Sequence, residues 1–412
     1  MLRAMTSGDW RRAAREPRWR ALAGAFVTVI LAQGLSNSFP VFLLPISDDM
    51  GGLRSMSAAV YSVHNLVMGL VGTVVDPLMR RVGERRIMLA GAVVMGGGVA
   101  LAATAGSPLG LLLWFGVIAG AGAGLLGSVA QLVVLSRWFP TARGAVNGVA
   151  FSGMGLGIFL AAPLTALLVD HFGWRWAMAG LGAGAGLLLL PAVLLTPRLM
   201  AEAAASPAAS AAPADDGPGL SAALVTPRFW CFAAAFFFTP VSNFMVTTHQ
   251  VAHIVEAGID ARRAAAAFGT VGLLSAIGRV TFGTLSDRWG RVPTALLSYA
   301  ATAGGTLALL LLAPGSPSWL LWAYVLPFGL TLGARGPIVA ALTADVYRGR
   351  NFGPVLGVIT FGNRVGSAIG PWLGGVIYDV TGSYRLAFGV SIVALAVAAV
   401  AFAAAGRTRA SD

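Results

Sequence analysis

The sequence predicts an all-α membrane protein with twelve transmembrane helices in two pseudo-symmetric six-helix bundles. The 412 residues are 57% hydrophobic and only 11% charged, and the mean hydropathy is +0.78. Ordinary soluble domains carry about 25% charged residues. Apolar runs long enough to cross a bilayer core of about 30 Å recur along the whole chain. Segments of the first half also recur in the second half.

Twelve apolar runs are separated by short polar segments. They lie at residues 21–45, 57–79, 87–105, 109–132, 144–168, 175–196, 228–252, 264–286, 293–313, 318–344, 353–378 and 384–405. The first run is long enough to span, and no clear small-residue cleavage pattern follows it, so we expect it to stay as a helix rather than be removed as a signal peptide. The single cysteine, Cys231, excludes an internal disulfide framework and a cysteine-only metal site.

All 28 basic residues are arginines, and their distribution predicts how the chain is oriented. If the N-terminus is cytoplasmic, twenty arginines fall in cytoplasmic segments and five in the opposite loops. The remaining three, Arg279, Arg335 and Arg364, fall within predicted spans. This asymmetry follows the positive-inside rule and predicts a multi-pass protein of the cytoplasmic membrane with both termini in the cytoplasm. It also accounts for the net charge of +12 without a nucleic-acid partner.

A segment rich in Ala, Pro and Asp, MAEAAASPAASAAPADDGPGLSAAL, follows the sixth span and is typical of a flexible linker. The predicted parts are an N-terminal tail (1–20), an N-terminal bundle (21–196), a cytoplasmic linker (197–227), a C-terminal bundle (228–405) and a C-terminal tail (406–412). The bundles repeat one another, since GTVVD at 72–76 recurs as GTLSD at 283–287. At an offset of 209, the residues Gly144, Gly148, Gly153, Gly157, Asp170 and Gly173 recur as Gly353, Gly357, Gly362, Gly366, Asp379 and Gly382. The matching glycines predict close helix packing in both halves.

The segment GTLSDRWGR, residues 283–291, resembles the G-x-L-x-D-R-x-G-R signature of the major facilitator superfamily, which lies in the cytoplasmic loop after the second helix of a six-helix half. GTVVDPLMRRVGERR is similar to a diverged first copy. Within that superfamily, RWFPTARGAVNGVAFSGMGLG, TPRFWCF and AIGRVTFGTLSDRWGR resemble the monocarboxylate transporter family and its oxalate/formate exchanger relatives. The resemblance implies a secondary transporter, monomeric as a functional unit, that works by alternating access around a site near the bilayer midplane.

Arg279 is the leading candidate for substrate binding. It lies eight residues before Asp287, and therefore about 12 Å along a helix from the cytoplasmic loop. A charge at that depth costs at least about 2.5–3.5 kcal/mol on insertion scales and generally faces a cavity or a partner. An internal salt bridge is the alternative, although no acidic residue is predicted in the middle of a span. A guanidinium can donate two parallel hydrogen bonds to a carboxylate, and the resemblance implies that this arginine binds the substrate carboxylate.

The other two arginines within spans leave more alternatives open. Arg364 would favour a dicarboxylate if it faced the same cavity as Arg279, and otherwise would link to backbone carbonyls or another helix. The resemblance places the lysine of the oxalate exchangers nearest Asn363, one position away. Arg335, in GARGPIV, is expected to bond carbonyls freed by an irregular turn, in a structural or gating role.

The residues that would couple transport to protons are incomplete. The resemblance implies an Asp one helical turn before the eighth-helix arginine, and that position is Ser275. It also implies a lysine in the first helix, where Ser-Asn-Ser stands at 36–38. Three histidines within spans could titrate near neutral pH or serve as hydrogen-bonded packing residues: His64, His249 and His253. Proton symport and exchange against a counter-anion therefore both remain open.

Other polar side chains within spans could orient a hydroxyl or keto group of the substrate, or simply join helices. The candidates are Asn37, Tyr61, Asn65, Asn243 and Tyr324, together with His249. Three aromatic residues could line the cavity or pack: Trp114, Phe115 and Phe361.

Two aspartates at predicted helix ends suggest a gate. The helix dipole disfavours Asp76 and Asp287 there unless another group holds them. By the repeat, Asp287 would meet the start of the fifth helix near Arg143 and Gly144, and Asp76 the start of the eleventh near Phe352 and Gly353. Such contacts would latch the cytoplasmic side and break when it opens. Three further arginines complete the predicted gate: Arg80, Arg288 and Arg291.

No sequence motif favours an enzyme. The chain contains no G-x-x-x-x-G-K-[ST], no H-E-x-x-H and no G-x-S-x-G, and its soluble segments are too short for a nucleotide-binding domain. We therefore expect a transporter of small organic carboxylates, such as lactate or pyruvate, without cofactor or metal. An oxalate/formate-type dicarboxylate exchanger is the alternative. A multidrug or amphiphile exporter fits less well, because its cavity would be expected to hold a buried acid.

Overall fold

The computed structural model describes residues 16–139, 143–197, 220–336, 338–339, 342 and 352–407. These residues are almost entirely helical, and none of them lies in a strand. Nine of the described helical segments are long and apolar enough to cross a membrane. One of the nine bends into two arms, and the shorter apolar helix at Ser318–Leu332 and a 30-residue helix at Phe352–Thr381 complete the twelve predicted spans.

In the N-terminal half, the first and fourth predicted spans are each built from more than one helical segment. The helices are α2 (Pro17–Asn37), α3 (Phe39–Asp49), α4 (Arg54–Val82), α5 (Glu84–Ala102), α6 (Pro108–Leu111), the π-helix η1 (Leu112–Ala119), α7 (Gly120–Leu126), α8 (Ser128–Trp138) and α9 (Arg143–Leu195). The first span is α2 and α3, which meet at Ser38 because Pro40 at the start of α3 has no N–H to continue the ladder. The fifth and sixth spans are the two arms of α9.

The C-terminal half is built in the same way, with one shortened span. Its helices are α10 (Leu220–Leu224), α11 (Pro227–Glu256), α12 (Ala261–Trp289), α13 (Arg291–Leu311), α14 (Ser318–Leu332), α16 (Phe352–Thr381) and α17 (Tyr384–Arg407). The irregular turn expected within the tenth span, 318–344, is present: α14 ends in a turn at Gly333 and Ala334 before the chain becomes helical again at Arg335. Glycine lacks the helix-favouring side chain at this point.

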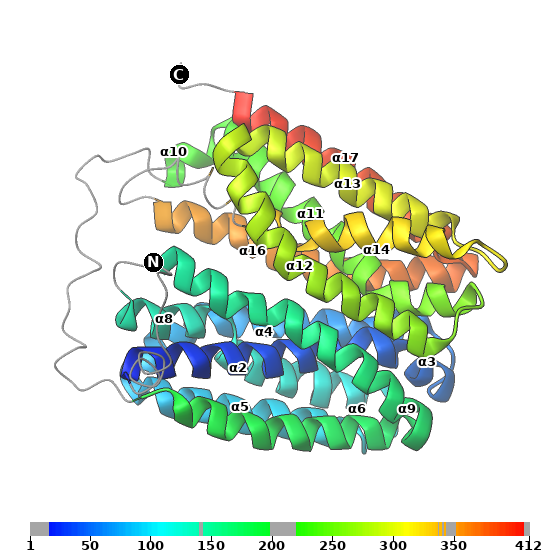
Figure 1. Ribbon diagram of the computed structural model, residues 1–412, viewed down its shortest axis with the longest axis horizontal. Coiled ribbons are helices and arrows are strands. Elements are labelled where there is room, and N and C mark those ends of the chain that lie inside the picture. The colour runs from blue at the N-terminus through cyan, green and yellow to red at the C-terminus, as the bar shows by residue number, and fades with distance from the viewer. Residues whose placement is uncertain are drawn as a thin grey trace, which may run out of the picture.

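The two halves lie side by side as two layers of roughly parallel helices, with the blue-to-green half below and the yellow-to-red half above (Figure 1). They meet where α4 packs on α16, α9 on α12 and α3 on α11. The start of α2 and the end of α17 lie at the same end of the molecule (Figure 1). We call this the termini end, which is the predicted cytoplasmic side, and we call the opposite end the distal end.

Glycines that match in the two halves make equivalent close contacts. A Cβ added at Gly157 would collide with the carbonyl of Ile30 on α2, and one added at Gly366 would collide with the carbonyl of Phe237 on α11. The prediction of close packing in both halves is confirmed for this pair. It is wrong for Gly357 and its partner in the first half, because both face open space.

The connection after the fifth helix of each half also repeats. Gly173 has φ +76° and Gly382 has φ +68°, a backbone region that favours glycine. Each turns the chain three residues after a matching aspartate, Asp170 or Asp379. The repeat therefore places two equivalent carboxylates at the distal end, one in each half.

Candidate functional site

Arg279 lies where the two halves meet. It is on α12 and is partly buried, and its Nη1 donates to the backbone carbonyl of Phe151 on α9 at 2.9 Å. Its Nη2 is 3.7 Å from the sulfur of Met154, also on α9. No carboxylate forms an ion pair with Arg279 in the part of the chain that the structure describes. Its guanidinium therefore keeps most of its donors available for an anion.

Glycines bring α9 and α14 close to Arg279. Gly155 of α9 packs against Gly272 of α12, and a Cβ at either position would meet the other helix. A Cβ added at Gly278 would collide with the carbonyl of Leu330 on α14. One added at Gly333 would lie 3.0 Å from Nη2 and 3.1 Å from Nε of Arg279. The guanidinium therefore lies directly beside the backbone where α14 ends.

The sequence did not identify these positioning residues. Phe151 accepts a hydrogen bond from Arg279 through its backbone carbonyl, which has no sequence signature. Gly333 has no side chain, and this leaves room for the Arg279 guanidinium. The only available signal was a glycine one or two residues before Arg279 and Arg335, in GR at 278–279 and GAR at 333–335. Ser275, one turn before Arg279, donates its hydroxyl to the Gly272 carbonyl at 2.7 Å within α12.

Arg364 also lies against the opposite half. It is on α16, and a Cβ added at Gly69 of α4 would lie 2.7 Å from its Cδ and 2.9 Å from its Cγ. The neighbouring Asn363 instead donates to the Phe236 carbonyl on α11, at 3.4 Å, and so turns toward its own half. The Arg364 guanidinium has no hydrogen-bond or ion-pair partner among the described residues. Arg279 and Arg364 are thus two cations without counter-ions, both at contacts between the halves.

Arg335 is held by neutral acceptors inside the C-terminal half and is only 3% exposed. Nη1 donates to the Ser298 carbonyl at 3.1 Å and to the Thr302 hydroxyl at 2.7 Å, both on α13. Nη2 donates to Oδ1 of Asn243 at 3.0 Å, and the guanidinium carbon lies 4.7 Å from the ring centre of Tyr299. The expected carbonyl partner is present, but it belongs to α13 and not to the turn after α14.

Three of the predicted substrate-binding residues form one cluster on α2 and α4. The Tyr61 hydroxyl donates to Oδ1 of Asn37 at 3.0 Å, and Nδ2 of Asn65 donates to the Tyr61 carbonyl at 2.8 Å. Nδ2 of Asn37 donates to the Gln33 carbonyl at 2.8 Å. Tyr61 is 1% exposed and stacks on Phe39 with ring centres 5.4 Å apart.

The three histidines in spans are buried and bonded to neighbouring helices. His64 lies 3.0 Å from both the Phe115 carbonyl and the Ser36 hydroxyl. Nε2 of His249 lies 2.8 Å from the Pro371 carbonyl, and Nε2 of His253 lies 2.9 Å from the Leu309 carbonyl. Nδ1 of His249 is buried without a hydrogen-bond partner among the described residues. A role of these histidines in substrate binding or proton transfer stays a prediction.

The remaining candidates have partners or surroundings other than Arg279. The Tyr324 hydroxyl donates to Oε1 of Gln250 and is fully buried. Phe115 is buried against His64 and Phe39, Trp114 packs against the core, and Phe361 is 54% exposed.

At the termini end, four of the predicted gate residues, Asp76, Arg80, Asp287 and Arg288, form no hydrogen bond or ion pair with the opposite half among the described residues. Asp76 accepts from Arg80, four residues later in α4. Asp287 and Arg288 are exposed, and Asp287 has no ion pair among the described residues. The side chains of Arg143 and of residues 352–353 lie outside the described part, so the predicted latches to them remain predictions. Arg291 begins α13.

At the distal end, carboxylates join the two halves. Oδ1 and Oδ2 of Asp379, on α16, accept from the backbone nitrogens of Arg54 and Ser55 at the start of α4, at 2.8 and 2.9 Å. The Arg54 guanidinium lies 3.7 Å from Glu256 of α11. Asp170 of α9 pairs with Arg262 of α12.

These distal contacts were not predicted. The repeat had matched Asp170 with Asp379, but it gave no sign that each contacts the start of a helix in the opposite half. These contacts join the two halves at the distal end.

Comparison with known proteins agrees with this architecture. The family model described as Major Facilitator Superfamily matches residues 24–334 and 282–411. Monocarboxylate transporter 12-B of Danio rerio is 24% identical over 410 residues, covering 92% of this chain and 84% of that protein. Monocarboxylate transporter 13 of Bos taurus is 28% identical over 376 residues, covering 90% and 85%.

A solved structure has the same fold. It is a bacterial homolog of the human lysosomal transporter Spinster, inward-facing and unoccupied, with a TM-score of 0.73 over 96% of this chain and 98% of that chain. At 16% sequence identity, this similarity concerns the fold alone.

Proposed function

The chain belongs to the major facilitator superfamily and is a secondary transporter, and we propose that it carries a small organic carboxylate bound by Arg279. The leading substrate class is a monocarboxylate such as lactate or pyruvate. The observation that supports this most directly is the position of Arg279 between the halves, where it donates to a backbone carbonyl and has no carboxylate partner among the residues that the structure describes. The names of its relatives point to the same substrate class.

Binding would exchange one acceptor of Arg279 for a stronger one. The bond from Nη1 to the Phe151 carbonyl joins a charged donor to a neutral acceptor across the halves. A substrate carboxylate could accept two parallel bonds from the same guanidinium, and such charge-assisted pairs are roughly twice as strong as neutral ones. The substrate would therefore loosen a contact between α12 and α9, which links binding to movement of one half against the other.

We also propose that the described conformation is inward-facing. Asp379 and Asp170 join the halves at the distal end, whereas Asp76 and Arg80 pair with each other within α4 and Asp287 forms no ion pair among the described residues. We place the termini end in the cytoplasm, following the excess of arginine there. When the protein turns outward, the distal contacts break and the termini end closes. The predicted gate residues would then meet: Asp76, Arg80, Asp287, Arg288, Arg291 and Arg143.

A second candidate function is exchange of a dicarboxylate such as oxalate. It is favoured by Arg364, a second guanidinium without a counter-ion at the surface between the halves. If both cations face one cavity, a substrate with two carboxylates would be bound at both ends. Replacing Arg364 by Ala would then abolish dicarboxylate transport and leave monocarboxylate transport. If the change is without effect on both, the two-cation site is excluded.

The proposal is tested by uptake into proteoliposomes across a panel of mono- and dicarboxylates, with and without a pH gradient. Saturable lactate or pyruvate uptake is expected. Stimulation by an inward proton gradient would indicate symport, and stimulation by an internal carboxylate without a gradient would indicate exchange. Transport of hydrophobic cations, with no carboxylate transported, would instead indicate an amphiphile exporter.

A further inference from the structure

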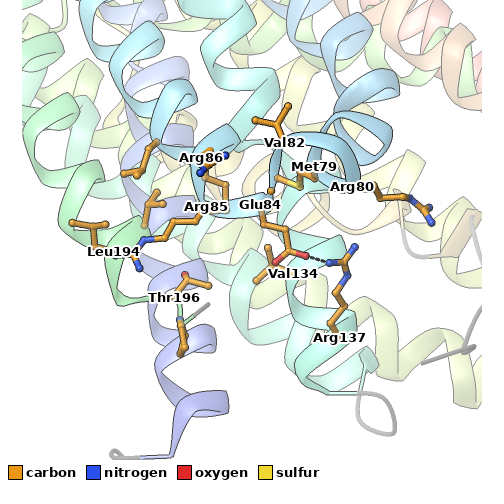
Figure 2. A pocket seen from close by; sticks show the side chains of 15 residues that line it. Met79, Arg80, Val82, Glu84, Arg85, Arg86, Val134, Arg137, Leu194 and Thr196 are labelled. Atoms are coloured by element: carbon orange, nitrogen blue, oxygen red, sulfur yellow. Dashed lines mark hydrogen bonds and ion pairs between the residues drawn. The ribbon is translucent and has the colours of Figure 1, made fainter. Parts of the chain in front are cut away.

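A second basic site lies at the termini end of the N-terminal half, away from Arg279. It is a cavity of about 720 Å³ between the start of α5 and the ends of α8 and α9. Figure 2 shows its polar lining, which includes four arginines and one carboxylate: Arg80, Arg85, Arg86, Arg137 and Glu84. All of the lining residues belong to the N-terminal half. The cavity is therefore separate from the contacts between the halves.

Two of the four arginines lack a counter-ion. Arg80 pairs with Asp76. Arg137 pairs with Glu84 (Figure 2). Arg85 and Arg86 form no ion pair or hydrogen bond through their side chains in the part of the chain that the structure describes. The cavity thus carries an excess of two positive charges.

Backbone donors add to this excess. The 19-residue helix α5 begins at Glu84 after Gly83, and Gly83 provides no side-chain cap. The first N–H groups of a helix lack internal partners, and they favour anions together with the helix dipole. Thr196 also lines the cavity, but its hydroxyl oxygen is itself buried and lies beside Gly24 of α2. The site therefore offers guanidinium and backbone donors to an anion.

Apolar side chains complete the lining and extend to the protein surface. Val82 is 41% exposed and Leu194 is 43% exposed, although both line the cavity beside the arginines. Val134 and Val193 form part of the wall. An anion with an apolar portion would contact both kinds of surface.

We propose that this cavity binds a phosphate group, supplied by the headgroup of an anionic lipid or by a soluble phosphate ester. Two arginines can each donate paired hydrogen bonds to phosphate oxygens, and basic pockets between helices on the cytoplasmic side bind anionic lipid headgroups. The exposed apolar rim provides a place for the glycerol and the first part of the acyl chains. A lipid source uses the whole lining, and a soluble ester uses only the polar part.

The test measures binding to the full-length purified protein in detergent, by native mass spectrometry and by thermal stabilisation. The three probes are dihexanoyl phosphatidylglycerol, dihexanoyl phosphatidylcholine and glycerol 1-phosphate. Stabilisation by phosphatidylglycerol but not by glycerol 1-phosphate is expected and assigns the site to a lipid. Equal stabilisation by both assigns it to the phosphate of a soluble ester. No preference for either anion over phosphatidylcholine overturns the proposal.

Variants locate the site. Replacing both Arg85 and Arg86 by Gln is expected to weaken phosphatidylglycerol binding by about tenfold or more, because each arginine near an anionic lipid contributes about 1 kcal/mol. The matched control replaces Arg81 and Arg288 by Gln, since both are exposed and neither lines the cavity. Replacing Arg85 and Arg86 by Lys keeps the charge and should restore most of the binding. Equal losses in the Gln variant and in the control would overturn the assignment.

Discussion

Asp379 caps the first turn of a helix in the opposite half of the molecule, with its Oδ1 2.8 Å from the backbone nitrogen of Arg54. Its Oδ2 lies 2.9 Å from the next nitrogen, that of Ser55. A carboxylate at a helix N-terminus is favoured both by the unpaired N–H groups and by the helix dipole. Because the acceptor is on α16 and the donors are on α4, the contact must break before the distal end can open. It therefore stabilises the closed distal end.

Replacing Asp379 by Ala is expected to shift the protein toward the outward-facing state. Loss of a helix cap costs about 0.5–2 kcal/mol, which corresponds to a shift of about twofold to thirtyfold in the equilibrium. Ser62, about 12 Å along α4 from Arg54, is buried and accepts from the backbone nitrogen of Trp372 on α16. A Ser62→Cys reporter in a Cys231→Ser background should react faster with an impermeant maleimide from the distal side.

Asp260→Ala is the control for this experiment. Asp260 caps α12 within its own half, by accepting from the nitrogens of Arg262 and Arg263. Its loss is expected to have a much smaller effect on labelling of the reporter. If Asp379→Ala labels no faster than the wild type, the cap does not hold the distal end closed.

The pair between Asp170 and Arg262 is expected to contribute less to the closed distal end. Both side chains are about half exposed, at 53% and 52%, and exposed ion pairs contribute about 0.2–1 kcal/mol. Arg262→Ala should therefore increase labelling of the same reporter less than Asp379→Ala does. The increase should also become smaller at high salt, which screens the pair in the wild type. A larger increase than in Asp379→Ala would show that this pair is the principal contact.

Replacing Arg335 by Met is expected to destabilise the protein and not to alter substrate affinity selectively. The variant loses three charged hydrogen bonds, and each such bond contributes about 1.5–3 kcal/mol. The apparent melting temperature in detergent should fall clearly. Arg279→Gln is the matched control, because it removes a cation with a single carbonyl acceptor and should leave the melting temperature nearly unchanged. Equal melting temperatures for Arg335→Met and the wild type would exclude the structural role.

Placing a carboxylate at residue 275 is expected to make transport depend on pH. Residues 275 and 279 are one turn apart on the same face of α12, so an Asp in place of Ser275 would pair with Arg279 and compete with the substrate. Protonation of that Asp at lower pH frees the guanidinium, and uptake should therefore rise as pH falls. The ratio of uptake at acidic to neutral pH in Ser275→Asp is compared with Ser275→Asn. The same ratio in both variants would contradict the placement of Arg279 in the binding site.

The sequence revealed those parts of the fold and of the site that depend on side-chain polarity. Twelve apolar runs predicted the helices, and Arg279 was recognisable because a charge in an apolar run is costly. Partners that act through the backbone could not be predicted. Every residue has a backbone carbonyl, and every residue except proline has a backbone N–H. The sequence therefore does not single out the carbonyl of Phe151 or the nitrogens of Arg54 and Ser55. Their positions depend on how the two halves pack.

The helix breaks were predicted in part. The Gly and Pro around Arg335 suggested an irregular turn, but the end of α14 at Gly333 was still placed inside one span. Asn363 and Arg364 differ by one position, and sequence spacing alone did not show which of them faces the other half. Side chains of neighbouring residues on a helix point in directions about 100° apart around its axis. Asn363 and Arg364 therefore face different helices. Asn363 bonds to α11, whereas Arg364 packs on α4.

The most direct test of carboxylate binding is the concentration dependence of lactate and pyruvate uptake by proteoliposomes that contain Arg279→Lys or Arg279→Ala. Two hydrogen bonds to a charged group together contribute about 3–6 kcal/mol, so Arg279→Ala should lower kcat/KM by at least about 100-fold. Lysine retains the charge but not the planar fork, and Arg279→Lys should recover only part of the loss. Wild-type uptake by both variants would contradict the assignment of Arg279 as the carboxylate ligand.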